Sequence, residues 1–341
     1  MKTIRWGMIG CGSVAEVKSG PAFSKVEGSE LVAVMRRDGD RARDYAKRHG
    51  VPRWYDRAED LIADAEVDAV YVATPVGSHC EYALTTAAAG KPCYVEKPMA
   101  RNAAECRRMI ESFEGAGVPL FVAYYRRAMP RFAKVGRLID SGRLGTLTGI
   151  QYRYAEPRHD KIDPDNLPWR LRPEHGGGLV MDMGSHALDI IDHLIAPLEH
   201  VAGNAANLAS PCPVEDTCTM TFTAAGIPGA ATWNFASSER EDQLTLTGTA
   251  GRLRISMFSE EPIELQGADG IEIFDIPFPE HVQQPLIASI VDELRGEGRC
   301  PSPATAALRT SEVLDAILAG YYVGRDDDFW NRAESWPGLR R

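Results

Sequence analysis

The chain has 341 residues, of which 44% are hydrophobic and 25% charged, so it is long enough for two domains with substantial buried cores. A formal net charge of −10 argues against a nucleic-acid or anionic-membrane surface, and no apolar run approaches the ~20 residues that span a bilayer. The seven cysteines are scattered and form no Cys-x-x-Cys pair, which predicts a reducing, cytoplasmic location without disulfides or a zinc knuckle.

The first part of the chain alternates between short apolar runs and helical patterns. Strands are expected over residues 4–9, 30–35, 53–55, 69–74, 92–96 and 119–124, with helices over 13–25, 40–49, 79–89 and 103–116. This βαβ alternation is typical of a doubly wound, mostly parallel sheet with helices on both faces. We therefore predict a Rossmann-type dinucleotide-binding domain over residues 1–124.

From residue 125 onward the pattern changes to alternating polar and apolar residues with glycine and proline between the segments. After a helix over 129–141, strands are expected over 147–154, 217–223, 230–236, 243–249 and 252–257, with a helix inserted over 181–194. These segments predict a second, α+β domain over residues 125–341, built on an open and mostly antiparallel sheet. An amphipathic helix over 304–322 can pack back on the first domain.

A glycine-rich turn follows the first predicted strand. In Gly10-x-Gly12-x-x-Ala15 the first glycine permits the tight turn, and the second lets backbone N–H groups approach a pyrophosphate. The helix that follows presents its N-terminus to the anion. The predicted pyrophosphate site comprises Gly10, Cys11, Gly12, Ser13 and Val14.

The end of the second strand discriminates between the two nicotinamide cofactors. An NAD site usually places an acidic residue here, whereas this chain has Arg36 and Arg37. Guanidinium groups favour a 2′-phosphate, which they grip through paired hydrogen bonds, so NADP is predicted in preference to NAD. The alternative is that the arginines are solvated surface charges and that Asp38 binds the ribose hydroxyls of NAD.

Two further strand ends carry candidate residues. Thr74 and Pro75 end the fourth strand and are expected to line the nicotinamide-ribose channel, while His79 either contacts the cofactor or caps the next helix. Glu96 and Lys97 end the fifth strand. An ammonium group at that edge points into the crevice where a dinucleotide binds, and it can orient a hydroxyl or share a proton during hydride transfer.

The second domain contributes a carboxylate and an imidazole after a run of glycines at 176–178. Asp182 and His186 are four residues apart, so they share one face of the predicted helix, and His186 is a candidate acid or base. Asp189 and His193 repeat this spacing and leave a metal site as an alternative, but they are rotated away from the first pair, so no metal is predicted.

The motifs occur in an order that resembles the glucose-fructose oxidoreductase, inositol dehydrogenase and MocA family over nearly the whole chain. The resemblance is carried by Gly7–Gly12, Ala73-Thr74-Pro75, Ala89-Gly90-Lys91-Pro92, Glu96-Lys97-Pro98, and the segment from Gly176 to His186. The pair Trp169-Arg170 is similar to one that lies near the cofactor in the 1,5-anhydrofructose reductase branch. The resemblance implies that a Rossmann domain carries NAD or NADP, and that an open sheet binds substrate and often mediates oligomerisation.

The resemblance also implies catalytic roles and a substrate class. Lys97 matches the family's Glu-Lys-Pro lysine, and Asp182 and His186 match its Asp-x-x-x-His pair. The implied reaction is hydride transfer between NADP and a secondary alcohol or ketone of a sugar, polyol or similar small molecule, by a homodimer or homotetramer. The choice between Lys97 and His186 as the proton carrier stays open. A dihydrodiol dehydrogenase and a non-catalytic sensor of NADP(H) are the alternatives.

Overall fold

The computed structural model describes residues 3–12, 15–157, 163, 166–176, 178–326 and 328–337, apart from the side chains of residues 17, 18 and 174. The chain divides into two compact units. The first comprises Met1–Met129 and Pro279–Leu308, and the second comprises Pro130–Phe278 and Arg309–Arg341. The segment 279–308, which the sequence interpretation placed with the second domain, thus packs with the first unit.

The first unit is built on a parallel sheet of six strands in the order β3-β2-β1-β4-β5-β6. These strands are β1 (Ile4–Ile9), β2 (Ser29–Met35), β3 (Arg53–Tyr55), β4 (Ala69–Val72), β5 (Cys93–Val95) and β6 (Leu120–Val122). This order is that of the doubly wound dinucleotide-binding sheet, so the predicted Rossmann fold is confirmed. Strands β4, β5 and β6 are buried at every residue, as expected where helices cover both faces.

Helices connect these strands and cover the sheet. They are α1 (Gly20–Lys25), α2 (Gly39–His49), α3 (Ala58–Ala63), α4 (His79–Ala88) and α5 (Ala103–Ala116). A π-helical turn over Ala15–Ser19 precedes α1, and short 3₁₀ turns cover Val76–Ser78 and Tyr125–Ala128. Asp38 and Asn102 cap α2 and α5 by accepting backbone N–H groups, and Gly50 and Gly117 end these helices in the left-handed conformation.

The returning segment 279–308 completes the first unit. Its helix α8 (Gln284–Leu294) contacts α1 and the turn Tyr125–Ala128. The Val122 N–H donates to the Ser302 carbonyl over 3.1 Å, and the Ser302 hydroxyl donates to the Val122 carbonyl over 2.7 Å. Ala304 and Ala307 are part of the apolar core beneath the sheet. The last strand, β6, therefore gains its outer partner from a segment about 180 residues later in the chain.

The second unit is built on an eight-stranded sheet in the order β14-β13-β12-β11-β7-β10-β9-β8. These strands are β7 (Leu147–Pro157), β8 (Leu198–Ala206), β9 (Thr217–Ala224), β10 (Ile227–Ser237), β11 (Glu241–Gly248), β12 (Gly251–Ile255), β13 (Ile263–Gly267) and β14 (Gly270–Phe274). Only the pairing of β7 with β10 is parallel among these strands. The open, mostly antiparallel sheet predicted from the sequence is confirmed.

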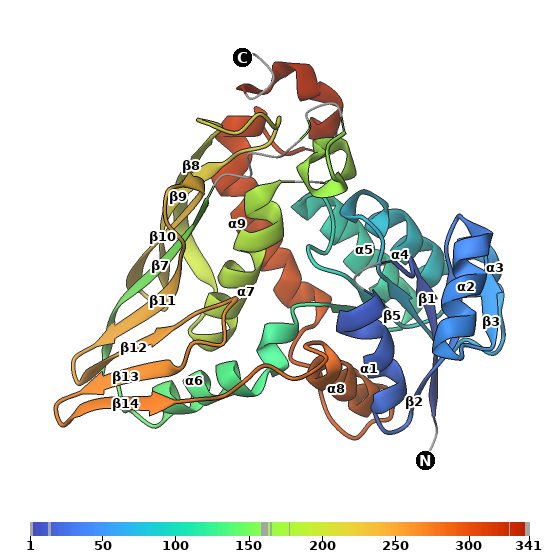
Figure 1. The fold of residues 1–341 in the computed structure, drawn as a ribbon, viewed down its shortest axis with the longest axis horizontal. Coiled ribbons are helices and arrows are strands. Elements are labelled where there is room, and N and C mark those ends of the chain that lie inside the picture. Colours follow the sequence, from blue (N-terminus) through green and yellow to red (C-terminus); the bar gives the residue numbers. More distant parts are fainter. Residues whose placement is uncertain are drawn as a thin grey trace. The chain divides into compact units, whose positions relative to one another are not determined.

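One face of this sheet is covered by helices. Figure 1 shows α6 (Pro130–Asp140), α7 (Ser185–Leu194) and α9 (Ala304–Tyr322) along the same face of the sheet. The side chains that point toward the helices are apolar and buried, for example Ile150, Trp233 and Leu244, whereas their neighbours along the strands point to solvent. This alternation places the core of the second unit on the helical face.

Several elements were not expected from the sequence, namely α3, α8, β8, β13 and β14. The helix expected over 181–194 begins instead with a π-helical turn, Val180–Gly184, before α7. Within the part of the chain that the structure describes, no helix combines the length and apolarity that a membrane span requires.

Candidate active site

The glycine turn between β1 and the following helix has the geometry that a pyrophosphate site needs. Gly10 has φ +95°, and a Cβ there would lie 2.8 Å from the Thr74 Cγ2 and 2.9 Å from the Ala73 carbonyl group, so only glycine fits. Among the described residues, a Cβ at Gly12 would meet only the Gly10 carbonyl, at 3.9 Å, so none of them crowds the backbone there. Ser13 and Val14 lie outside the described residues.

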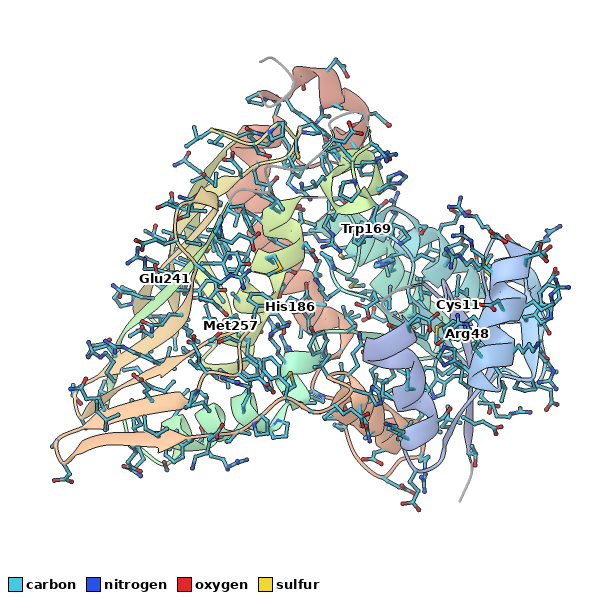
Figure 2. All side chains as sticks on the ribbon, viewed as in Figure 1. Cys11, Arg48, Trp169, His186, Glu241 and Met257 are labelled. Atoms are coloured by element: carbon cyan, nitrogen blue, oxygen red, sulfur yellow. The ribbon has the colours of Figure 1, made fainter. Side chains whose placement is uncertain are left out.

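Cys11 turns its side chain into the protein. The thiol is buried and lies 3.6 Å from the Met35 carbonyl, and burial raises its pKa to about 11. The neutral thiol is therefore a packing group, and any contact of Cys11 with a phosphate would involve its backbone. Figure 2 labels Cys11, at the glycine turn, and Arg48, which lies on α2.

The two arginines after β2 differ in their surroundings. Arg36 is partly buried, and its guanidinium donates to the Cys11 carbonyl over 3.5 Å, whereas Arg37 is exposed. Asp38, the alternative NAD ligand, accepts the Arg41 backbone N–H over 3.2 Å as the N-cap of α2 and pairs with the Arg41 guanidinium at 3.2 Å. A cation thus lies beside the glycine turn, and Asp38, two residues after Arg36 in the sequence, is engaged in capping.

An ion-pair cluster fastens the start of the first helix to α2. Glu16 accepts both terminal nitrogens of Arg48, at 2.9 and 2.7 Å, and its carboxylate is 2.8 Å from the His49 Nε2. These donors lower the pKa of Glu16 to about 2. The Tyr45 hydroxyl donates to the Ala15 carbonyl over 3.1 Å, so the helix that follows the glycine turn is held at two points.

The loops after β4 and β5 are joined through a buried histidine. The ring of His79 places Nε2 2.8 Å from the Thr74 carbonyl and Nδ1 3.0 Å from the Pro98 carbonyl. His79 is fully buried, and burial lowers its pKa. It stands at the first residue of α4, and its ring ties two loops together instead of capping the helix. Pro75 is exposed and Thr74 is partly exposed.

β5 ends at Val95, one residue before the predicted end, and Lys97 follows two residues later and is partly exposed. Its peptide bond to Pro98 is cis. The neighbouring Glu96 is buried, and its carboxylate accepts hydrogen bonds from Tyr71, Gln283 and the Lys97 backbone N–H. The loops after β1, β4 and β5 thus meet at one edge of the sheet, with Gly10 against Thr74 and Thr74 joined to Pro98 through His79.

In the second unit, Asp182 lies in the π-helical turn and His186 in the first turn of α7. Asp182 is partly exposed, and its backbone N–H donates to the Gly178 carbonyl over 2.9 Å. A Cβ at Gly184 would come within 2.9 Å of Val180 and 3.3 Å of Trp233, so this glycine allows the turn to pack closely on β10. π-Helical turns of this kind occur often at functional sites.

A buried carboxylate anchors the start of that turn. Glu215 is fully buried and accepts the Val180 backbone N–H over 2.8 Å, and the Tyr322 hydroxyl donates to its other oxygen. Burial raises the pKa of Glu215, while these two donors and the charge of Arg325 oppose the rise. Arg325 lies 2.9 Å from Asp315 and within hydrogen-bonding distance of the Met181 sulfur, at 3.3 Å.

His186 is buried beside aromatic side chains. Its ring meets Phe258 edge-on with 5.7 Å between centroids, and Phe258 meets Tyr154 edge-on at 5.6 Å. Phe235 adds a third ring, 5.4 Å from Tyr154. Figure 2 places His186 on α7, near Met257 of the segment that carries Phe258. The surroundings of the imidazole are therefore largely apolar on this side.

The remaining predicted residues lie in short 3₁₀ turns before α7. Trp169 and Arg170 are exposed, and the Arg170 guanidinium lies 5.9 Å from the centre of the Trp169 ring.

The second Asp/His pair, which left a metal site as an alternative, lies on α7. Asp189 is buried and His193 is exposed, so these two side chains do not share an environment. Within the described ranges, no cluster of three or more His, Cys, Asp or Glu side chains is arranged to hold a metal ion.

The sequence interpretation missed the residues that hold this site in place. Tyr71, Gln283 and Glu215 are buried polar side chains that bond to Glu96 or to the π-helical turn. Gln283 and Glu215 come from segments remote from the motifs they support. One local signal was available for Glu215: it follows Pro213 and Val214 and lies two residues before a predicted strand. A carboxylate that is buried at such a place needs hydrogen-bond partners.

Both units match models of known domains. Residues 4–124 match the oxidoreductase family with an NAD-binding Rossmann fold, GFO/IDH/MocA, and residues 132–254 match the GFO/IDH/MocA C-terminal domain. Among solved structures, levoglucosan dehydrogenase in complex with NADH and levoglucosan has a TM-score of 0.83 at 19% identity, covering 93% of this chain and 96% of that one. A 3-ketoreductase from Actinomadura kijaniata in complex with NADP has a TM-score of 0.80 at 23% identity, covering 94% and 98%.

Relatives in sequence extend this similarity. Oxidoreductase P35 of Formosa agariphila is 36% identical over 316 residues, covering 92% of this chain and 98% of the relative. The 1,5-anhydro-D-fructose reductase of Ensifer adhaerens is 32% identical over 201 residues, covering 58% and 59%. The trans-1,2-dihydrobenzene-1,2-diol dehydrogenase of Mus musculus is 27% identical over 255 residues, covering 74% of each chain.

The resemblance inferred from the motifs is therefore confirmed over both units. The family models together span most of the chain, and the first relative matches almost end to end. A sensor without turnover is not favoured by these relatives, which are named as dehydrogenases and reductases. The chain belongs to the GFO/IDH/MocA family and is an NAD(P)-dependent oxidoreductase.

Proposed function

We propose that this enzyme uses NADP to interconvert a secondary alcohol and a ketone in a sugar, polyol or related small polyhydroxylated molecule. The single observation that carries the proposal is the position of Lys97 two residues after the end of β5, at the sheet edge where the glycine turn and Thr74 also lie. Relatives and neighbours named for anhydrofructose and levoglucosan support the substrate class. When bound, the nicotinamide supplies hydride acceptance or donation.

The residues of the first unit fit the cofactor. The positive φ of Gly10 and the lack of crowding at Gly12 by any described residue suit a pyrophosphate on the glycine turn, and Thr74 lies against that turn. Arg36, whose guanidinium lies against the Cys11 carbonyl, supplies the cation that a 2′-phosphate requires. The engagement of Asp38 as the N-cap of α2 supports NADP over NAD.

In this proposal, Lys97 and His186 act on the same substrate oxygen. The Lys97 ammonium donates a hydrogen bond to that oxygen and stabilises alkoxide charge as it develops. The His186 imidazole takes the hydroxyl proton during oxidation and returns it during reduction. Asp182 binds a neighbouring hydroxyl group or orients the imidazole. The open outer face of the second sheet is the surface through which we expect two or four copies to associate.

The test is hydride transfer by the purified enzyme, followed through the absorbance of the reduced cofactor. A panel of sugars, polyols, inososes and ketoses is offered with NADP and with NAD. Lys97→Ala and His186→Ala are each expected to lower kcat/KM by about 10²- to 10⁴-fold. Because both act on one oxygen, the double variant should lose much less than the product of the single losses. Full activity of Lys97→Ala would overturn the assignment.

Cofactor preference has its own matched pair of variants. Arg36→Ala is expected to raise KM for NADP about tenfold or more and to leave KM for NAD nearly unchanged, because it removes the partner of the 2′-phosphate. Arg37→Ala, which removes an exposed guanidinium one residue later, is the control. If Arg36→Ala affects both cofactors equally, Arg36 does not read the 2′-phosphate.

The aromatic surroundings of His186 favour a second candidate, a dihydrodiol dehydrogenase. Phe258 meets the imidazole edge-on, and Tyr154 and Phe235 extend the aromatic cluster behind it; such rings pack well against a cyclohexadiene diol. Relatives named for this activity cover about three quarters of the chain. Including a trans-dihydrodiol in the substrate panel separates the two candidates, since a sugar enzyme should turn it over at least tenfold more slowly.

A further inference from the structure

Glu96 is the centre of a buried hydrogen-bond network in the first unit. Its Oε1 accepts the Tyr71 hydroxyl over 2.6 Å and the Gln283 side-chain amide over 2.5 Å. Its Oε2 accepts the Lys97 backbone N–H over 3.2 Å. A carboxylate that receives three donors is held in one orientation, and the third donor belongs to Lys97 itself.

Two further side chains, Tyr94 and Ser19, hold those donors in place. The Tyr94 hydroxyl donates to the Gln283 amide oxygen over 2.8 Å, which fixes the orientation of that amide. Tyr71 has one hydroxyl proton, which goes to Glu96, so Ser19 donates to Tyr71 across their 3.1 Å contact. The rings of Tyr71 and Tyr94 stack with 4.9 Å between centroids. All of these side chains are buried.

The network joins four elements that are distant in sequence. Ser19 ends the helical turn after the glycine turn, Tyr71 lies on β4, Tyr94 lies on β5, and Gln283 immediately precedes α8. Because Gln283 has 1% of its surface exposed and Tyr71 none, neither side chain is available to touch a cofactor or a substrate. Their influence on the chemistry must pass through Glu96 and the backbone of Lys97.

We propose that Gln283 and Tyr71 are positioning residues for Lys97, which they hold in place through Glu96. The inference rests on the proposed role of Lys97. Removing the amide donor leaves Glu96 with fewer partners, and a buried carboxylate that loses a partner turns toward other donors or toward solvent. That turn withdraws the acceptor from the Lys97 backbone N–H and loosens the residue that carries the ammonium group.

The first test compares Gln283→Met and Tyr71→Phe with the wild-type enzyme. Each removes a donor to Glu96 and nearly preserves side-chain size, and each is expected to lower kcat about tenfold while KM for the cofactor changes less than twofold. Tyr55→Phe is the matched control, because the Tyr55 hydroxyl bonds Asp64, 2.9 Å away and outside this network. Thermal melts identify any variant that has lost its fold.

A further variant, Gln283→Glu, tests whether the hydrogen bond that residue 283 donates to Glu96 is required. Gln283→Glu keeps the shape but places a carboxyl group against Glu96. Glu96, Tyr71 and Tyr94 are the titratable groups whose hydrogen bonds converge there, and burial raises the pKa of both tyrosines, so these hydroxyls stay protonated. Like-charge repulsion raises the pKa of the introduced carboxyl, which donates to Glu96 only when protonated. The activity of this variant relative to wild type should therefore rise as pH falls, whereas that of Gln283→Met should not.

A third measurement does not depend on catalysis. Hydrogen–deuterium exchange of the peptide spanning residues 95–99 should quicken about tenfold in Gln283→Met, because the Lys97 N–H loses a fixed acceptor. The Tyr55→Phe control should match wild type. Unchanged exchange and unchanged kcat in folded Gln283→Met would overturn the inference. Faster exchange in an enzyme that turns over no polyhydroxylated substrate would support the positioning role and contradict the proposed function instead.

Discussion

Charged side chains near the glycine turn attach the helical turn Ala15–Ser19 to α2. Glu16 is the second residue of that turn and accepts two hydrogen bonds from one guanidinium and a contact from His49. Such bidentate pairs are stronger than ordinary surface pairs, although the Glu16 side chain keeps 33% of its surface exposed to solvent screening.

This pair predicts a pH dependence of stability. The folded pKa of Glu16 is about 2, below its ordinary value of 4.5, so its contribution is fully present above pH 4.5 and is lost as pH falls toward 2. After discounting for exposure, we expect Glu16→Gln to cost about 1–2 kcal/mol at pH 7.

Urea unfolding of Glu16→Gln and wild type at pH 7, 5 and 3 measures this effect. The difference in the free energy of unfolding should be equal at pH 7 and 5 and smaller at pH 3. Arg43→Gln, which removes an exposed i,i+3 pair with Asp40, is the control and should change stability by no more than about 0.5 kcal/mol. A difference that grows toward low pH would contradict the assigned pKa.

At the scale of elements, the π-helical turn before α7 depends on a side chain from another strand. The turn Val180–Gly184 begins at a backbone N–H that donates to Glu215, and Glu215 is held in turn by Tyr322 near the end of α9. Asp182 follows two residues after that anchored N–H. The geometry of the predicted acid–base segment therefore depends on the contact between the loop before β9 and α9.

Two replacements of Glu215 test whether its hydrogen bonds, and not only its size, stabilise the protein. Glu215→Leu leaves the Val180 N–H and the Tyr322 hydroxyl without an acceptor in a buried place, at a cost of about 1–3 kcal/mol each. We expect Tm to fall by about 5 °C or more. Glu215→Gln keeps an oxygen for Val180, and the tyrosine hydroxyl can accept from its amide, so its Tm should fall by less than half as much. Equal Tm values for the wild type and both variants would show that the hydrogen bonds of Glu215 do not stabilise the π-helical turn.

At the scale of the whole chain, the first unit is assembled from two separate segments. The segment 279–308 supplies the Gln283 amide to Glu96, the Ser302 hydrogen bonds to Val122, and core packing from Ala304 and Ala307. A fragment that stops at Met129 exposes the polar and apolar surface that this segment covers.

We therefore expect a fragment of residues 1–129 to be unfolded or much less stable than the same fragment joined to 279–308 by a flexible linker. Circular dichroism during heating measures both. The joined fragment should melt cooperatively, and a version carrying Ser302→Ala, which loses the hydroxyl bond to β6, should melt a few degrees lower. Identical melting of the two fragments would mean that the first segment folds without its later partner.

The local parts of this architecture could be predicted because their signals are short-range. The βα alternation, the glycine turn, the position of Lys97 after β5 and the spacing of Asp182 and His186 each follow from patterns within a few residues. The edge strand β14 and its neighbour β13 escaped detection, and in β14 Ile271 and Ile273 are 60% and 55% exposed, so apolar residues there do not mark a buried face. Helix α8, which has a proline at its second residue, was also not expected from the sequence.

The sequence by itself determined the family, the Rossmann and open-sheet domains, and the residues that carry the proposed chemistry, because these depend on backbone geometry that nearby residues impose. Only the tertiary structure decided that Gln283 supports Glu96, that Glu215 anchors the turn before His186, and that 279–308 completes the first unit. These bonds join side chains tens to nearly two hundred residues apart. A buried polar group must be satisfied by whatever donor or acceptor the fold brings to it, and no local pattern specifies that partner.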